Sequence, residues 1–131
     1  MPFATFETGL RGTAVLTVTE SDTARALGSG DVEVLGTPRL IALCEAATIN
    51  AIAGVLDEAT SSVGMRIRVD HLQPTAVGEV VTAEASLEQV DGRRLTFTVS
   101  VSDRGGLVAA GKVTRALVDR AKFMDKCCSP A

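Results

Sequence analysis

The hydrophobic pattern of the chain predicts one long, mostly apolar helix over residues 37–56. Thr37 can cap its start, because a threonine oxygen accepts a hydrogen bond from the free N–H groups of the first turn. Pro38 then fits the first helical position, where a missing N–H costs nothing. At about 100° per residue, Arg39 and Asn50 fall on one stripe, which we expect to face water.

A carboxylate interrupts the apolar side of this predicted helix. By the same geometry Glu45 lies about 120–140° from the polar stripe, among Ile41, Ile49 and Ile52. An ionised carboxylate is costly to bury without partners, so Glu45 should be paired, protonated or facing a cavity. Carboxylates in that position are frequently functional. The alternative is a glutamate that reaches water at the helix edge.

After the helix the pattern changes to period two, which predicts strands. One further strand precedes the helix, so the predicted strands cover residues 13–19, 63–71, 79–90, 93–103 and 107–118. In the strand that follows the helix, one apolar face carries Val63, Met65, Ile67, Val69 and His71. We expect this face to pack on the helix.

Glycines mark two further features of the predicted sheet. Asp91-Gly92 is typical of a two-residue hairpin turn in which both central residues have positive φ. In the last strand the alternation is blurred around Gly111, which predicts a β-bulge there. Gly64 and Gly111 are both positions where a bulge, or the close approach of a ligand to the backbone, would favour glycine.

The order of elements indicates an α+β fold: a strand, a long helix and then a four-strand meander. A helix that is apolar almost all round must be covered on several sides, and an antiparallel sheet curled around it would do this. A second copy would cover the remaining edge. This is the hotdog architecture, usually a homodimer. The 131 residues form one domain, with 1–10 as an irregular lead-in and 121–131 as an irregular tail.

Composition narrows the partners and the compartment. The chain is 46% apolar and 22% charged, which is typical of a soluble globular protein. No apolar run reaches the roughly 18–20 residues of a membrane span, and no secretory signal is present. A net charge of −3 with scattered basic residues, and no Trp or Tyr, argues against nucleic acid as a partner.

The three cysteines, Cys44, Cys127 and Cys128, have no metal-site spacing. They favour a reduced, cytoplasmic compartment. His71 is the single histidine, and no cluster of metal ligands accompanies it. We therefore expect no metal and no cofactor.

Several separate runs of the sequence resemble the fluoroacetyl-CoA thioesterase type of hotdog protein, over about residues 32–123. They are Gly36-Thr37-Pro38 on to Glu45-Ala46-Ala47, then 64–71, 90–95 and 111–116. Thr37, Glu45 eight positions on, and His71 twenty-six beyond that match the family's catalytic Thr, Glu and His in order and spacing.

The resemblance implies hydrolysis of an acyl-CoA thioester in a hotdog homodimer, with sites at the subunit interface. It makes Thr37, Glu45 and His71 the catalytic set, places Gly64 near the thioester, and matches Arg115 to an Arg late in the last strand. The family's fluoroacetate-selective member has an aromatic lid before the helix. Residues 26–35 hold no aromatic residue, and this departure from the family pattern argues against fluoroacetyl selectivity, while the expectation of thioester hydrolysis is not affected.

Two chemical routes are open for such a site. Glu45 acts as a general base on water, or it attacks the carbonyl and forms an anhydride that water opens. Thr37 would orient Glu45 or donate to the oxyanion, and His71 would orient the water or help to protonate the thiolate. A backbone N–H at Gly64 or at the helix start is a candidate oxyanion donor.

The phosphates of CoA need cations. Arg66, Arg68 and Lys112 are the candidates for that contact, and the alternative is that these side chains are simply solvated on the strands.

Two other functions share the fold. A non-catalytic hotdog module would bind an acyl-CoA or acyl chain, with the carboxylate and the histidine as polar anchors. An enoyl-CoA hydratase would need an acid and a histidine in a different arrangement, and the sequence shows no second such pair.

Overall fold

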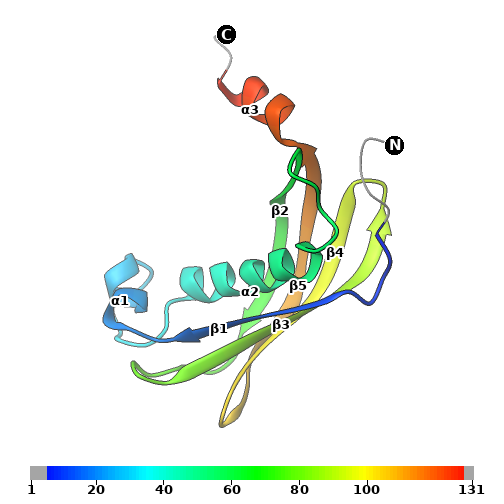
Figure 1. The fold of residues 1–131 in the computed structure, drawn as a ribbon. Coiled ribbons are helices and arrows are strands. Elements are labelled where there is room, and N and C mark those ends of the chain that lie inside the picture. The colour runs from blue at the N-terminus through cyan, green and yellow to red at the C-terminus, as the bar shows by residue number, and fades with distance from the viewer. Residues whose placement is uncertain (1–5, 129–131) are drawn as a thin grey trace.

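The computed structural model describes residues 6–128, in which a five-stranded antiparallel sheet curls around one long helix, α2 (Figure 1). The strand order is β1-β3-β4-β5-β2. The strands are β1 (Arg11–Thr17), β2 (Thr60–His71), β3 (Val80–Asp91), β4 (Arg94–Asp103) and β5 (Gly106–Asp119). The helices are η1 (Glu20–Asp22), α1 (Ala24–Leu27), α2 (Thr37–Ile52) and α3 (Arg120–Cys128). The predicted α+β arrangement is confirmed.

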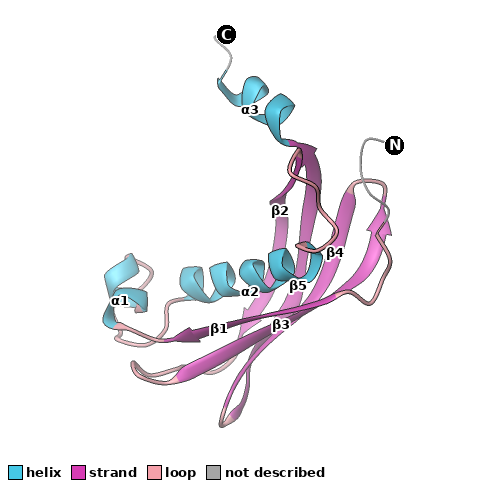
Figure 2. Ribbon diagram, in the orientation of Figure 1, coloured by secondary structure: helices cyan, strands magenta, loops and turns pink. Residues whose placement is uncertain are grey.

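The helix α2 lies on the concave side of the sheet (Figure 2). The hydrophobic core fills the space between the helix and the sheet. The inward faces of β3 and β4 are buried, as the period-two pattern predicts. They carry Val81, Ala83, Ala85, Leu87, Leu95, Phe97, Val99 and Val101. From α2, Leu40, Leu43 and Ile52 complete this core. The helix is therefore held by one face of the sheet.

The predicted four-strand meander is wrong in one connection. β3, β4 and β5 form a meander, but β2 pairs with β5 and lies at the edge of the sheet. The register sets Gly64 opposite Arg115 and His71 opposite Ala109. Alternation along a strand fixes which residues share a face, but it carries no information about the neighbouring strand.

A β-bulge in β2 divides that strand into two halves. The register with β5 shifts between Gly64 and Arg66, so Met65 is the extra residue. Beyond the bulge, Ile67 and His71 lie on the helix side, as predicted. Before it, Val63 pairs with Ala116 on the outer face, so its predicted place on the helix face is wrong.

The start of α2 differs in detail from the prediction. Gly36 is the N-cap residue and its carbonyl accepts from Leu40, while Thr37 is the first helical residue and its side chain does not cap. Pro38 therefore occupies the second position, where a missing N–H is equally harmless. The helix ends at Ile52 instead of residue 56, and a turn follows.

Both predicted glycine features are also revised. The β3–β4 turn is centred on Gly92 and Arg93, because Asp91 already pairs with Arg94. Gly92 has φ +60°, and no other residue type among residues 6–128 has positive φ, so this is a turn with glycine at its first central position. Gly111 is not at a bulge. A Cβ there would overlap the carbonyl oxygen of Arg68, so the close approach of β2 requires glycine.

The chain ends also depart from the predicted irregular segments. Phe6, in the lead-in, is buried in the core, and residues 1–5 lie outside the described range. The predicted irregular tail instead forms α3, which projects beyond the sheet (Figure 1) and buries no side chain. The Asp119 carboxylate accepts from the Lys122 backbone N–H at 3.0 Å and stabilises the helix start. Residues 129–131 are outside the described range.

Within residues 6–128, no helix combines the length and the apolar character that crossing a membrane requires.

Gly12 lies where β1 crosses α2, and an added Cβ would overlap the carbonyl oxygen of Ala47 and the amide of Ala51. We expect Gly12→Ala to lower the free energy of unfolding by about 1–3 kcal/mol, because the strand must move off the helix. Gly54→Ala is the matched control, since a Cβ there meets no atom within 4 Å. Urea denaturation measures both, and equal stability of the two variants would contradict this packing.

Candidate active site

Two polar pairs lie on the helix side of the sheet. In the first, Thr37 Oγ1 and His71 Nδ1 are 2.8 Å apart and share a hydrogen bond. In the second, Arg115 Nη1 donates to Glu45 Oε2 at 3.0 Å. The three predicted catalytic residues therefore belong to two clusters: the first joins α2 to β2, and the second joins α2 to β5 and to Ser62 of β2.

The first pair joins the first turn of α2 to the last residue of β2. Beside it lies a cavity of about 360 Å³, whose lining includes Val34, Leu35 and Leu72. Burial lowers the pKa of His71, and the nearby backbone of Gln73 only partly opposes this shift. The imidazole is therefore neutral at pH 7. Its Nε2 is buried and has no hydrogen-bond partner among residues 6–128.

The second pair is anchored by a buried guanidinium. Arg115 is 5% exposed, its Nε donates to Ser62 Oγ at 2.8 Å, and its Nη2 donates to the Ser62 carbonyl at 3.0 Å. Burial lowers the pKa of Arg115, and the Glu45 carboxylate opposes that shift. The ordinary arginine pKa is so high that the group stays charged. Arg115 therefore fixes the position of Glu45.

Glu45 itself remains accessible. Its side chain is 33% exposed, in contrast to its arginine partner, so part of the carboxylate can meet a ligand. Gly64 of β2 faces the Glu45 carboxylate, and a Cβ at Gly64 would overlap Glu45 Oε2. Glycine is required there by the approach of the carboxylate to the β2 backbone.

The sequence shows why Arg115 and Glu45 form a pair. In β5 the inward positions are Val113, Arg115 and Leu117, so the alternation places one cation in an apolar row. A buried cation needs a partner, and Glu45 is the carboxylate that α2 brings to it. The alternation of inward and outward positions along β5 could therefore have predicted that Arg115 pairs with a carboxylate. Ser62 was missed, because a serine near a strand start carries no distinctive pattern.

The two clusters do not touch within one chain. Thr37 and Glu45 are eight residues apart on the same helix, about 12 Å along its axis. Among residues 6–128, no hydrogen bond joins Glu45 to Thr37 or to His71. Within one chain, the Glu45 carboxylate and the His71 imidazole therefore lie too far apart to act on the same bond.

The other predicted binding residues lie on the outer face of the sheet. Arg66 pairs in register with Thr114 and Arg68 with Lys112, on the side away from α2. Lys112 Nζ is 3.1 Å from Glu88 Oε1, so its charge is already partnered. The structure does not bring these cations together with Glu45, and their contact with CoA phosphates stays a prediction.

Two other features of the described residues bear on the chemistry. Cys44 is fully buried, and burial, with a further effect of Glu45, raises the pKa of its thiol to about 11. It is therefore protonated and a poor nucleophile. No group of three or more His, Cys, Asp or Glu side chains suited to a metal ion occurs in residues 6–128.

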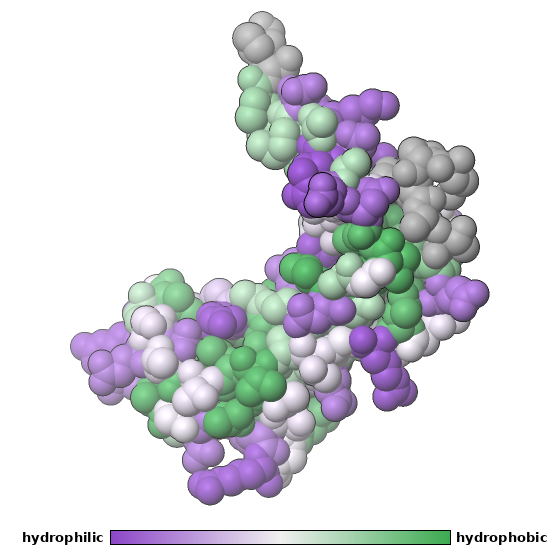
Figure 3. Space-filling view, viewed as in Figure 1, coloured by the Kyte–Doolittle hydropathy of each residue, from purple (hydrophilic) through white to green (hydrophobic). Residues whose placement is uncertain are grey.

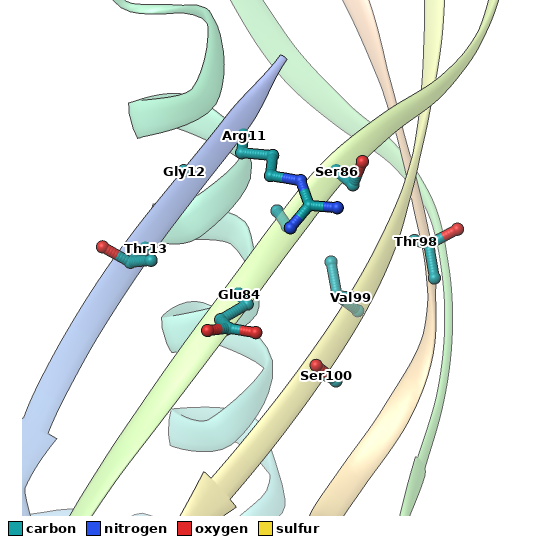
Figure 4. A pocket seen from close by; sticks show the side chains of 9 residues that line it. Arg11, Gly12, Thr13, Glu84, Ser86, Thr98, Val99 and Ser100 are labelled. Atoms are coloured by element: carbon teal, nitrogen blue, oxygen red, sulfur yellow. The ribbon is translucent and has the colours of Figure 1, made fainter. Parts of the chain in front are cut away.

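A separate pocket of about 230 Å³ lies over β1, β3 and β4 (Figure 4). Arg11, Glu84 and Ser86 line it together with threonine and serine side chains. It contains none of the predicted catalytic residues, so the helix side of the sheet remains the candidate active site.

A family model described as "Fluoroacetyl-CoA-specific thioesterase" matches residues 18–121. The chain belongs to this family. A curated relative, the fluoroacetyl-CoA thioesterase of Streptantibioticus cattleyicolor, is 36% identical over 94 residues, which cover 72% of this chain and 68% of the relative. The resemblance noted in the sequence is thereby confirmed, and the protein is a thioester hydrolase of this family.

Solved structures agree. The fluoroacetyl-CoA thioesterase FlK superposes with a TM-score of 0.89 at 31% identity, covering 97% of this chain and 98% of the other. A hot-dog-like protein from Thermanaerovibrio acidaminovorans gives a TM-score of 0.85 at 26% identity, covering 93% and 90%. The predicted hotdog fold is confirmed. Variants of FlK have been solved with fluoroacetate and CoA and with acetyl-CoA.

His71 is the single histidine, so one imidazole signal in an NMR titration reports its pKa directly. We expect a value below the ordinary imidazole pKa of about 6.5, because burial disfavours the charged ring. Between the two values the unfolded chain binds more protons. The free energy of unfolding should therefore fall as the pH drops through this window. Above the window the stabilising contribution of the neutral His71 is complete.

His71→Gln is the control for that titration and should remove this part of the pH dependence. An imidazole pKa at or above the ordinary value would contradict the burial.

Proposed function

We propose that the protein hydrolyses an acyl-CoA thioester to the free acid and CoA, with Glu45 as the catalytic carboxylate. The observation that carries this proposal is the Glu45–Arg115 pair: a partly exposed carboxylate held on a buried guanidinium, facing the backbone at Gly64. Family membership supports the reaction class. The complexes of FlK with CoA and acetyl-CoA support the substrate class.

The fixed carboxylate suits either chemical route. Arg115 occupies Oε2 and leaves Oε1 without a hydrogen bond to residues 6–128. As a general base, Oε1 takes a proton from the attacking water while the thiolate leaves. As a nucleophile, it forms a mixed anhydride with release of thiolate, and water then opens the anhydride. Arg115 acts in both as a positioning residue.

Thr37 and His71 then need to reach the same thioester. We propose that a homodimer brings them there. In this dimer the β2 edge strands of the two subunits pair antiparallel about a two-fold axis near Ile67. That pairing would set the partner's His71 opposite residues 63–64, next to Glu45. Each active site then takes Glu45 from one subunit and Thr37 and His71 from the other.

The surface around β2 supports this interface. β2 is an edge strand, and Ile49, Met65 and Ile67 beside it are 45%, 43% and 36% exposed. A free edge with exposed apolar side chains is a surface that natural proteins usually cover.

We further propose that the protein is cytoplasmic and that the reaction needs no metal or cofactor. The three free cysteines support the first part, and a carboxylate that is held by an arginine and not by a cluster of metal ligands supports the second.

Glu45→Gln tests the catalytic role. We expect thiol release from acyl-CoAs to fall by about 10²–10⁴-fold, because an amide neither accepts the proton nor attacks the carbonyl. The substrate panel runs from acetyl to long-chain and aryl thioesters. Glu84→Gln, an exposed carboxylate on the outer face, is the matched control and should keep wild-type turnover. Negligible rates in wild type and variant alike, with tight acyl-CoA binding in both, would instead indicate a non-catalytic binding module.

A mixing experiment tests whether the active site is shared. Glu45→Ala and His71→Ala are each expected to be inactive alone. After subunit exchange, half of the dimers are mixed, and one of their two sites holds an intact Glu45 and an intact His71. The mixture should therefore regain about a quarter of wild-type activity. A mixture that stays as inactive as its components would show that both groups act within one chain.

A further inference from the structure

The helix α3 follows directly on β5 and buries none of its nine side chains. Isolated helices shorter than about 12 residues are barely stable in water, so a helix of this length normally packs on a neighbour. In the space-filling view α3 extends away from the body of the molecule (Figure 3). Its aromatic side chain, Phe123, is 40% exposed. The described residues of one chain therefore leave α3 largely uncovered.

A cavity of about 470 Å³ lies between α3 and the outer face of the sheet. Its floor is apolar and is formed by Val63, Ala116 and Val118. Val63 belongs to β2, which is an edge strand, and pairs with Ala116 of β5. The cavity therefore reaches the same edge of the sheet that the proposed homodimer pairs, on the face opposite to Glu45.

The walls of this cavity carry an excess of positive charge. Arg93 comes from the β3–β4 turn, and Lys122 and Lys126 come from successive turns of α3. None of these three cations forms an ion pair with another residue of the range 6–128. The one carboxylate that lines the cavity, Asp119, accepts from the backbone N–H of Lys122. In a chain of net charge −3, this gathering favours an anionic occupant.

An exposed carboxylate of the same strand is suited to this cavity, but only from another copy of the chain. Asp70 alternates with His71 and so lies on the outer face of β2, where it forms no ion pair within residues 6–128. Val63 is seven positions away along the strand, roughly 20 Å, so Asp70 does not reach the cavity of its own chain.

The proposed dimer removes that separation. With a two-fold axis near Ile67, antiparallel pairing sets residue 70 of one subunit opposite residue 64 of the other, beside Val63. The partner's Asp70 then lies at the mouth of the cavity, within the reach of a lysine side chain. The partner's Arg68 lies nearer to the axis, away from these cations.

We propose that α3 binds a second copy of this chain, with the cations of the cavity around the partner's Asp70. The assignment rests on the homodimer of the proposed function and goes beyond it, because it gives a role to a segment outside the active site. The two-fold axis repeats the contact, so each dimer contains two. Both stabilise the pairing of the β2 strands from the outer face of the sheet.

Charge reversal in the full-length chain tests this contact, with the dimer dissociation constant measured by sedimentation equilibrium. Lys122→Glu and Asp70→Lys, each alone, should raise that constant by about tenfold, because each sets like charges together at both contacts. A chain that carries both changes restores opposite charges and should dissociate less than either single variant. Since the two residues cannot meet within one chain, such a rescue requires a contact between subunits.

Arg11→Glu and Glu84→Lys are the matched controls, because they reverse the same charges at exposed positions on β1 and β3. Alone and together, they should keep the wild-type dissociation constant.

The dissociation constant does not depend on thiol release, so the outcomes separate this contact from the proposed reaction. A dimer that neither reversal weakens, or in which the two effects simply add, would overturn the contact and leave the cavity to a small anion. A monomeric wild type would overturn both the contact and the shared active site. Rescue in a dimer that releases no thiol would support the contact and refute the proposed hydrolysis.

Discussion

The structure depends on one ion pair more than on any other polar contact. Arg115 places a full positive charge in the apolar row of β5, which would be prohibitive without compensation. Glu45 and the two oxygens of Ser62 supply that compensation, so α2, β2 and β5 are joined at a single point. Removing one member of such a pair is costly, because the other charge is left buried.

The same pair fixes the orientation of Glu45, the catalytic carboxylate that we propose. A guanidinium on Oε2 fixes the orientation of the carboxylate before any substrate arrives, which is the preorganisation that catalysis in a polar site requires. The oxygen that Arg115 binds, Oε2, is also the one that faces Gly64 of β2, and Oε1 has no hydrogen bond to residues 6–128. The histidine that would complete the chemistry lies at the far end of β2, beside Thr37, and is kept neutral by burial.

Much of this could be predicted from the sequence, because hydrophobic periodicity reports directly on burial. The core faces of β3 and β4, the helix α2 and the unusual position of Glu45 all follow from it. The neighbours of β2 could not be predicted from this periodicity, since strand order depends on contacts between distant segments. Val63 was assigned to the wrong face because one extra residue, Met65, reverses the alternation and leaves no mark in the composition. Ser62 was missed because it becomes a neighbour of Arg115 only in the folded chain.

That extra residue also constrains the length of the chain. Gly64 must face Glu45 and His71 must face Thr37, yet the two are seven positions apart, an odd number that would put them on opposite faces of a regular strand. The bulge at Met65 resolves this conflict. Deleting or inserting one residue between Gly64 and His71 would therefore turn either position 64 away from Glu45 or the His71 side chain away from Thr37, although both residues would still be present in the sequence. The distance in sequence between these two positions is as much a part of the candidate active site as the residues themselves.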